Sequence, residues 1–486
     1  MLRPWPVSLG DRIDASRDVP LYMQIIQALI RDIESGRLAS GTYLPSSREL
    51  ARALGVNRKT VVLAYEDLIA QGWLESGGTR GTRVAAALPD PVNRHRSDAE
   101  ITMSSAVVDY RFAPPPERPI AVSSGPGLKI DEGAPDGRLF PAELLARAYR
   151  AAAHRGAQGN GFQYRDPRGS PALREAVATM LKSQRGLPVT AENICITRGS
   201  QNGIFLAAQV LVERGDSVVV EKLTYEPAVA AFRALGANIV PVGLDEGGID
   251  IEAVEHACRR NAVRAVFVTP HHQFPTTVSM RPERRLRLLD LARRFGFAII
   301  EDDYDHEFHF ESQPLLPLAA YGPAHVLYVG SLSKLLLPAL RIGYVAAPPQ
   351  VIDAIAHRVS ITDGMGNTLT EDAAADLIAN GELRRHGRKV LQVYAKRRES
   401  FAAEIDRLFG DLVDYRMPGG GLAFWLRFRT DLDRMEARAA AMGLRFASSR
   451  SFMTTGDAPR GLRIGFASLN AYEARTALAA LRQAAG

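Results

Sequence analysis

Three stretches near the start of the chain carry apolar residues at the spacing of helices. Residues 21–33 repeat in this way until Gly36 ends the pattern. Residues 46–54 begin with a serine that is followed three positions later by a glutamate, which is the spacing of a capping box. Residues 58–70 complete the set, with Asn57 as the expected N-cap. The pattern therefore predicts three short helices.

The second and third predicted helices are separated by a tight turn that contains Gly55, an order typical of a helix-turn-helix. In that motif the N-terminal residues of the second helix approach base edges in the major groove, and here they are Arg58, Lys59 and Thr60. Residues 76–84 then predict two short strands around a glycine-rich basic tip, the form of a wing. From the second helix to the end of the wing there are six basic and four acidic residues, so charge does not exclude a helical accessory domain. The order of the motifs favours DNA binding.

The rest of the chain divides by composition. Residues 86–120 contain repeated prolines and lack periodicity, which predicts a semi-rigid linker between residues 1–85 and residues 121–486. In the last of these segments short apolar runs alternate with amphipathic helical patterns, and this alternation predicts an α/β domain. Beyond Ile361 the pattern predicts a long basic helical stretch, followed by a turn and a strand.

A lysine stands just beyond one of the apolar runs. Residues 325–329 predict a buried strand, and Ser331, Ser333 and Lys334 follow at its carboxyl end, where open α/β sheets bind ligands. A lysine amine at that edge can form a Schiff base with an aldehyde cofactor, while the two hydroxyls and the guanidinium of Arg341 suit a phosphate dianion. Taken alone, this short pattern also fits a solvated lysine in a serine-rich turn.

Acidic and phenolic side chains follow a second apolar run. Residues 297–300 predict a strand, and Asp302 and Tyr304 lie directly beyond it. A carboxylate at that point can pair with a pyridinium nitrogen, and a phenol can hydrogen-bond to the ring hydroxyl. The acidic run alone would equally fit a metal-binding cluster or a charged turn. The position of Lys334, 32 residues after Asp302, favours pyridoxal 5′-phosphate (PLP) instead.

These residues resemble the pattern of fold type I aminotransferases, and with the N-terminal module the chain is similar to the MocR subfamily of bacterial regulators. That family joins a GntR-type winged helix to an aminotransferase-like domain. The resemblance implies an α/β protein in which a winged helix-turn-helix is linked to a large mixed α/β sheet domain with a smaller C-terminal α/β domain. It also implies PLP as cofactor, operator DNA as partner, and a homodimer with a domain-swapped head-to-tail arrangement.

The site candidates follow from the motifs and the resemblance together. The cofactor candidates are Gly199, Ser200, Gln201, Tyr225, Asp302, Tyr304, Ser331, Ser333, Arg341 and the catalytic Lys334, with Tyr164 implied to reach the cofactor phosphate of the partner subunit. The DNA-binding candidates are Arg48, Arg58, Lys59, Thr60, Arg80 and Gly81, and the resemblance assigns Arg463 to the carboxylate of an effector. The Gly-Ser-Gln turn also opens a predicted helix, whose first backbone N–H groups form an anion site.

Three of these residues have ordinary alternative interpretations. Tyr164 also fits a core or loop aromatic, and Tyr225 also fits a surface tyrosine beside a proline. Arg463 lies in a predicted strand, where an arginine also fits a surface salt bridge.

Two departures from the aminotransferase pattern change the functional expectation. Where aminotransferases usually have Asn-Pro-x-Gly, this chain has Phe274 in place of the asparagine and Thr277 in place of the glycine. The resulting His-Gln-Phe-Pro segment is typical of the MocR pattern, so the regulator is favoured and efficient transamination is not expected. The adjacent His271 and His272 offer metal ligands, but neighbouring side chains of a strand or loop rarely converge, so no metal is expected.

Composition sets the remaining bounds. The chain has 486 residues, 46% of them hydrophobic and 23% charged, which indicates a globular protein too long for one core. A net charge of +6 is compatible with a polyanionic partner without requiring one. Cys195 and Cys258 are the only cysteines, so a disulfide framework is not expected and a reducing compartment fits. With no N-terminal apolar signal segment and no apolar run of about 20 residues, we expect a cytoplasmic protein with no membrane partner.

The combined hypothesis is a PLP-dependent DNA-binding regulator that senses an amine or amino acid through a Schiff base at Lys334 and controls nearby metabolic genes. PLP itself is the alternative signal. The competing hypothesis is a PLP-dependent aminotransferase with an accessory DNA-binding module. Physiological turnover is not expected, although vestigial aminotransferase activity is compatible with the sequence.

Overall fold

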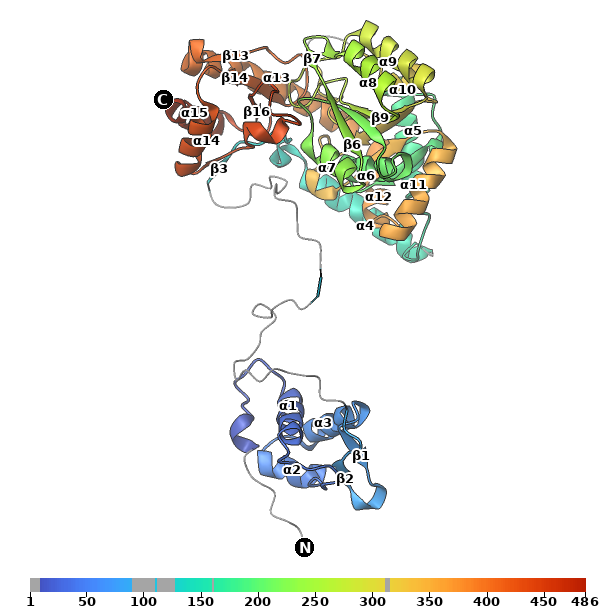
Figure 1. The fold of residues 1–486 in the computed structure, drawn as a ribbon, viewed down its shortest axis with the longest axis vertical. Helices are drawn as coiled ribbons and strands as arrows, with labels where there is room; N and C mark the ends of the chain where they lie inside the picture. Colours follow the sequence, from blue (N-terminus) through green and yellow to red (C-terminus); the bar gives the residue numbers. More distant parts are fainter. Residues whose placement is uncertain (1–8, 90–109, 112–126, 160, 311–314) are drawn as a thin grey trace. The chain divides into compact units, whose positions relative to one another are not determined.

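A computed structural model describes residues 9–89, 110–111, 127–159, 161–310 and 315–486 of the chain. These residues form two compact units, one N-terminal and one larger and C-terminal (Figure 1). Most of the predicted linker, namely residues 90–109 and 112–120, lies outside the described residues.

The N-terminal unit is a bundle of three helices with a two-stranded wing (Figure 1). Its elements are α1 (Leu21–Glu34), α2 (Ser47–Leu54), α3 (Arg58–Ala70), β1 (Leu74–Ser76) and β2 (Thr82–Val84). The two strands pair antiparallel. Apolar side chains from all five elements meet in one buried core, which includes Ile25, Leu29, Leu50, Val61, Leu68, Leu74 and Val84. The predicted winged helix-turn-helix is confirmed.

Local hydrogen bonds place the turn between α2 and α3. The hydroxyl of Ser46 accepts from the backbone N–H of Glu49 at 3.3 Å, and the Glu49 carboxylate accepts from the N–H of Ser46 at 3.0 Å, which completes a capping box. Gly55 ends α2 at a φ of 65°, a conformation that glycine adopts without strain. Asn57 caps α3 by accepting from the N–H of Lys59 at 2.9 Å. Residues next to each helix end therefore determine where that helix begins or stops.

The C-terminal unit is built on a seven-stranded mixed sheet in the order β4-β12-β11-β10-β9-β5-β6. The strands are β4 (Ile194–Thr197), β5 (Ser217–Glu221), β6 (Asn238–Val242), β9 (Val263–Val268), β10 (Ala298–Asp303), β11 (Val326–Ser331) and β12 (Gly343–Ala346). β12 pairs antiparallel with both of its neighbours, β11 and β4, and the other strand pairs of the sheet are parallel. Two short strands, β7 (Leu244–Asp245) and β8 (Gly248–Ile249), form a separate hairpin.

Helices cover both faces of this sheet (Figure 1). One buried cluster joins the sheet to α6 (Ser200–Leu211), α7 (Glu226–Ala234) and α11 (Pro349–Thr362). The other joins it to α4 (Ala142–Gln158), α5 (Pro171–Arg185), α8 (Ile251–Arg260), α9 (Pro282–Phe295), α10 (Leu318–Tyr321) and α12 (Thr368–Ala379). Along β5, Val218 and Val220 belong to the first cluster and Val219 to the second, as the alternation of a strand requires.

A smaller subdomain follows the sheet. It contains α13 (Glu382–Phe409), β13 (Val413–Tyr415), β14 (Ala423–Phe428), α14 (Leu432–Ala441), β15 (Leu444–Arg445), β16 (Leu462–Gly465) and α15 (Ala471–Ala485). The residues just after the linker also join it, because β3 (Leu128–Lys129) pairs in parallel with β15. Within the described part of the chain, no helix has both the length and the apolar character that crossing a bilayer requires.

Candidate functional site

The carboxyl ends of two neighbouring strands bring the predicted acid and lysine together. β10 and β11 pair in parallel with Asp302 opposite Val329, and Lys334 follows three residues after β11 ends. The sequence pattern ended the first strand at Ile300, but pairing with β11 extends it to Asp303. Asp302 is therefore held by the sheet itself rather than by a loop.

A cavity of about 420 Å³ opens at this edge of the sheet and is bounded by both subdomains. It brings together eight of the predicted cofactor residues: Ser200, Tyr225, Asp302, Tyr304, Ser331, Ser333, Lys334 and Arg341. The other lining residues are Lys129, Ile130, Asp131, Glu132, Ala134, Phe274, Pro338, Phe446 and Ala447. The lining residues do not include four other predicted site residues, namely Tyr164, Gly199, Gln201 and Arg463.

Burial shifts the pKa of the two central groups, Lys334 and Asp302. The amine of Lys334 donates to the carbonyl of Gly133 at 2.6 Å, and burial lowers its pKa against the opposing effect of nearby carboxylates. Asp302 is 3% exposed, and Oδ1 of its carboxylate has no hydrogen-bond partner among the described residues. Burial raises the pKa of Asp302 to about 8, with a further contribution from Asp303, while Lys334 opposes the rise. A cationic ring nitrogen beside Asp302 would relieve this cost.

Hydroxyl and guanidinium groups gather at the other end of the cavity. Gly199 precedes α6 at a φ of 84°, and a Cβ there would lie 2.8 Å from the guanidinium of Arg341. Arg341 donates to the carbonyl of Arg198 at 3.0 Å, so its guanidinium stays beside the start of α6. The buried hydroxyl of Ser333 has no partner among the described residues. Together with Ser200 at the first turn of α6, these groups suit a phosphate.

Arg463, on β16, is bonded within its own chain. It is 2% exposed and donates to the carbonyl of Glu132 at 2.8 Å, the carbonyl of Pro275 at 2.9 Å and the hydroxyl of Tyr304 at 3.2 Å. Its guanidinium carbon lies 4.6 Å from the ring centroid of Phe274, a cation–π contact. A carboxylate that reached Arg463 would have to replace one of these acceptors or use a remaining N–H.

The predicted DNA-binding residues lie on one structural motif of the N-terminal unit. Arg58 and Lys59 are exposed at the start of α3, and Arg48 is exposed on α2. The Arg58 side chain donates to the hydroxyl of Ser47 at 3.3 Å, which joins the two helices of the turn. Arg80 and Gly81 stand at the exposed wing tip, and Thr60 is half-buried behind Arg58 and Lys59.

Both parts of the chain match known families. Residues 21–84 match "Bacterial regulatory proteins, gntR family", and residues 128–481 match "Aminotransferase class I and II". The probable rhizopine catabolism regulatory protein MocR of Rhizobium meliloti is 32% identical over 479 residues, which cover 97% of this chain and 95% of that protein. The chain belongs to the MocR family of transcription regulators.

Two further comparisons extend the MocR relationship. The pyridoxine biosynthesis transcriptional regulator PdxR of Corynebacterium glutamicum is 29% identical and covers 100% of this chain and 99% of its own length. Among solved structures, the α-aminoadipate aminotransferase LysN of Thermus thermophilus, complexed with N-(5′-phosphopyridoxyl)-L-leucine, aligns with a TM-score of 0.68. That alignment has 27% identity and covers 74% of this chain and 92% of LysN.

The cofactor of the MocR-family aminotransferase domain is PLP, and the residues of this chain fit it. The buried, unpartnered Oδ1 of Asp302 is an acceptor for a protonated ring nitrogen. The unpartnered hydroxyl of Ser333 and the guanidinium of Arg341 suit the phosphate. Lys334 follows Ser333 directly in the sequence and lines the same cavity. Tyr225 lines the same cavity and contacts the Phe274 ring edge-on, at 5.2 Å between centroids.

Two predicted cofactor residues of this MocR-family chain lie elsewhere. The side-chain amide of Gln201, in the first turn of α6, donates to the carbonyl of Pro227 at 2.8 Å and does not line the cavity. Tyr164 is 91% exposed and lies outside the cavity of its own chain. The hydroxyl of Tyr304 donates to the carbonyl of His272 at 2.9 Å and accepts from Arg463.

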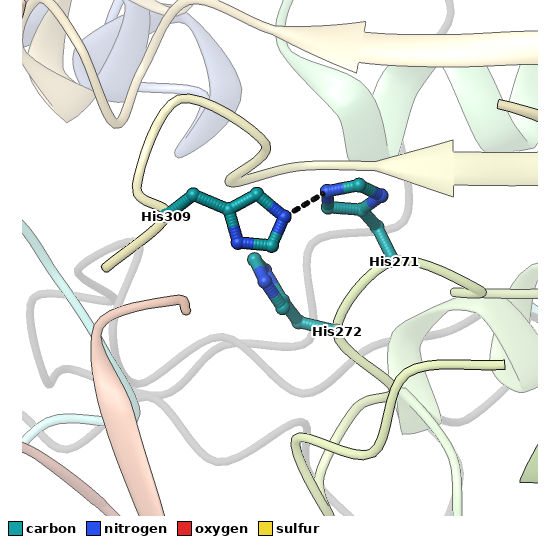
Figure 2. A group of neighbouring side chains, drawn as sticks. All are labelled: His271, His272 and His309. Carbon is teal, nitrogen blue, oxygen red and sulfur yellow. Dashed lines mark hydrogen bonds between the residues drawn. The ribbon is translucent and has the colours of Figure 1, made fainter. Parts of the chain in front are cut away.

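Three histidines converge beside the site (Figure 2). The expectation that the adjacent His271 and His272 point apart is wrong, because their ring centroids are 4.8 Å apart and both contact the ring of His309. Nε2 of His271 and Nε2 of His309 are 2.9 Å apart, a hydrogen-bond distance, and Nδ1 of His272 bonds to Asp305 at 2.7 Å. Burial lowers the pKa of His271 to about 2 and that of His309 to about 4, so both rings are neutral. The expectation that no metal binds here stays a prediction.

Sequence reasoning missed part of the cavity. Glu132 was not among the predicted site residues, although an acidic residue directly before Gly133 was an available signal. Phe446 and Ala447 reach the cavity only because β15 pairs with β3, and no local pattern marks that pairing.

Proposed function

We propose that this regulator senses a small amine or amino acid at the Lys334 cavity and converts its binding into altered operator binding. The observation that carries the proposal is that one chain combines an exposed recognition helix with a cavity that contains both Lys334 and the unpartnered Asp302. The aminotransferase part alone would support catalysis, and the winged helix alone would support constitutive DNA binding.

PLP, when bound, supplies an aldehyde that reacts with amines and a pyridine ring that withdraws electrons. Burial lowers the pKa of Lys334, so a larger fraction of its amine is neutral and nucleophilic near pH 7. Asp302 would hold the proton on the ring nitrogen, and Ser200, Ser333 and Arg341 would hold the phosphate. These assignments are proposals that rest on the cavity geometry.

The effector acts by linkage. An amine that competes with Lys334 for the cofactor changes DNA binding only if it binds one arrangement of the protein better than the other. Arg463 offers a source of such a difference, because its three hydrogen bonds tie the loop of Glu132, the loop of Pro275 and Tyr304 to β16. A carboxylate that exchanged one of these bonds would alter how the smaller subdomain sits on the sheet.

The functional unit we propose is a cytoplasmic homodimer with a domain-swapped head-to-tail arrangement. Tyr164, which the resemblance directs to the cofactor phosphate of the partner subunit, is 91% exposed in the single chain and is therefore available to a second copy. A bacterial transcription regulator must reach the chromosome, which lies in the cytoplasm. This requirement supports the proposed cytoplasmic location.

A second candidate signal is PLP itself. The similarity to PdxR, whose printed name is pyridoxine biosynthesis transcriptional regulator, extends over the whole of this chain and favours this candidate. Holo and apo protein would then differ in operator affinity with no amine added. The amine hypothesis requires an added amine as well as PLP.

Spectroscopy of purified protein with PLP tests the site. The wild-type protein should be yellow, and borohydride should fix the cofactor covalently on a peptide that contains Lys334. Lys334→Ala should lose the reducible band while keeping its fold by circular dichroism. A Lys334→Ala protein with the same reducible band would refute the assignment.

An amine screen tests the mechanism. Each amine is added to the PLP-loaded protein, and absorbance, operator binding and cofactor turnover are followed in parallel. We expect at least one amine to change both absorbance and operator binding with slow or absent turnover. Turnover near ~10 per second, typical of enzymes, without any change on DNA would favour the aminotransferase hypothesis instead.

A further inference from the structure

One acidic side chain of the cavity has no partner of its own. Glu132 lines the cavity in the loop that follows β3, and among the described residues its carboxylate makes no hydrogen bond or ion pair. Its backbone carbonyl, not its carboxylate, accepts from Arg463. Burial raises the pKa of Glu132, and Arg463, Lys334 and Lys129 oppose that rise from beyond ion-pair distance. A cation in direct contact with the carboxylate would offset more of the cost of its burial.

The other charged groups of the cavity are already accounted for. Asp302 and Lys334 are assigned to the cofactor ring and aldehyde, and Arg341 to the phosphate. Asp131 is satisfied, because its carboxylate accepts from the N–H groups of Gly133 and Ala134 at 2.7 and 2.5 Å and from the hydroxyl of Ser468. Lys129 is exposed and lines the same cavity, and it acts on Glu132 electrostatically without a hydrogen bond or ion pair between the two side chains.

The wall around Glu132 is apolar. The same cavity is lined by Ile130, Phe274, Phe446 and Ala447. Phe274 also belongs to a buried apolar cluster that includes Trp425 and Phe452. Such a wall suits methylene groups, and beside it the described cavity presents the carboxylate of Glu132 and the exposed amine of Lys129. The expected ligand is therefore aliphatic between its charged ends.

We propose that the effector carries two nitrogens, an amine for the cofactor and a second, cationic nitrogen that forms an ion pair with Glu132. Diamines and amino acids with a cationic side chain belong to this class, and in the amino acids Arg463 remains available for the carboxylate. The inference rests on the proposed function, since it presumes that the first amine reaches the cofactor of Lys334. The second nitrogen forms an ion pair and no covalent bond.

Matched pairs of amines provide the test with the full-length, PLP-loaded protein. The pairs are lysine and norleucine, ornithine and norvaline, and 1,4-diaminobutane and butylamine, which differ mainly in the second cation. The half-saturating concentration is measured from the cofactor absorbance and, independently, from operator binding. The member with the second cation should bind at about tenfold lower concentration or better, since a charged hydrogen bond contributes about 1.5–3 kcal/mol.

Three variants locate the effect. Glu132→Gln keeps the shape and should abolish the preference within each pair, while Glu132→Lys should shift the preference to acidic amino acids such as glutamate. Glu143→Gln, the same change at an exposed position on α4 outside the cavity, is the matched control and should keep the wild-type preference. PLP content, measured after alkaline release, should be unchanged in all three.

The outcomes separate this inference from the proposed function. If no amine of any kind changes absorbance and operator binding, the proposed function fails. If amines act but both members of each pair act equally, or if Glu132→Gln keeps the preference, only the assignment of the second nitrogen to Glu132 is wrong.

Discussion

At the scale of single residues, Thr277 has a backbone conformation that suits a different amino acid. Its φ is 63°, in the left-handed region, and its N–H donates to the carbonyl of Gln273 at 2.7 Å. The tight turn that carries Phe274 into the cavity requires this conformation. A non-glycine residue there costs roughly 1–2 kcal/mol, which explains why the aminotransferase pattern has glycine at this point.

Thr277→Gly should therefore stabilise the C-terminal unit. We expect a gain of about 0.5–1 kcal/mol, because the relief of strain is partly offset by the greater freedom of glycine in the unfolded chain. Urea unfolding followed by tryptophan fluorescence measures the shift in midpoint. Thr276→Gly is the control and should destabilise, since the hydroxyl of Thr276 donates to the Gln273 amide oxygen at 2.6 Å. A lower midpoint for Thr277→Gly would contradict the account.

The same scale shows what sequence can and cannot predict about the site. Lys334 and Asp302 were predictable because each follows a strand pattern, and strand ends share one edge of a parallel sheet. Glu132 and Phe446 were not, because their positions depend on a strand pair between residues far apart in sequence. The contact between His271 and His309 also joins residues far apart in the sequence, and no periodicity in either segment predicts it.

At the scale of elements, α3 presents its first turn to solvent while its other face fills the core. Val61, Ala64 and Leu68 are buried, and Arg58 and Lys59 are exposed. The elements of this unit were the easiest part of the chain to predict. Their caps and glycines act within a few residues, whereas the end of β10 depends on a partner strand.

Arg58→Ala should weaken operator binding. A bidentate contact from arginine to guanine contributes about 1–3 kcal/mol, or roughly ten- to a hundredfold in affinity. Fluorescence anisotropy at fixed salt measures the change, with a scrambled duplex for comparison. Arg31→Ala removes the same charge from an exposed position on α1 and should have a much smaller effect. If both variants lost the same operator affinity, Arg58 would contribute only its positive charge and no specific base contact.

At the scale of the whole molecule, the cofactor site of one chain is incomplete in our proposal. The described chain supplies Lys334, Asp302 and Arg341 to its own cavity, while Tyr164 stays exposed. A homodimer in which each copy completes the other would make cofactor binding depend on association. Dilution below the dimer dissociation constant should then release PLP.

Mixed dimers test the exchange of Tyr164. Tyr164→Phe should weaken PLP binding about tenfold or more, because a hydrogen bond to a charged phosphate contributes about 1.5–3 kcal/mol. Chains with Tyr164→Phe and chains with Lys334→Ala are then combined. In the mixed dimer the intact Lys334 meets an intact tyrosine from the other chain, so half of the sites should regain wild-type PLP affinity. No recovery would show that Tyr164 does not act across the dimer.

The pairing of β3 with β15 has a mechanical consequence. Chain coming from the DNA-binding unit is anchored at Leu128 and Lys129, and the loop that contacts the cavity begins at the next residue. In our proposal, a ligand that pairs with Glu132 contacts a point four residues from the start of that anchor. The point where the chain from the N-terminal unit joins the C-terminal unit is therefore a direct sequence neighbour of the cavity-lining residues Ile130, Asp131 and Glu132.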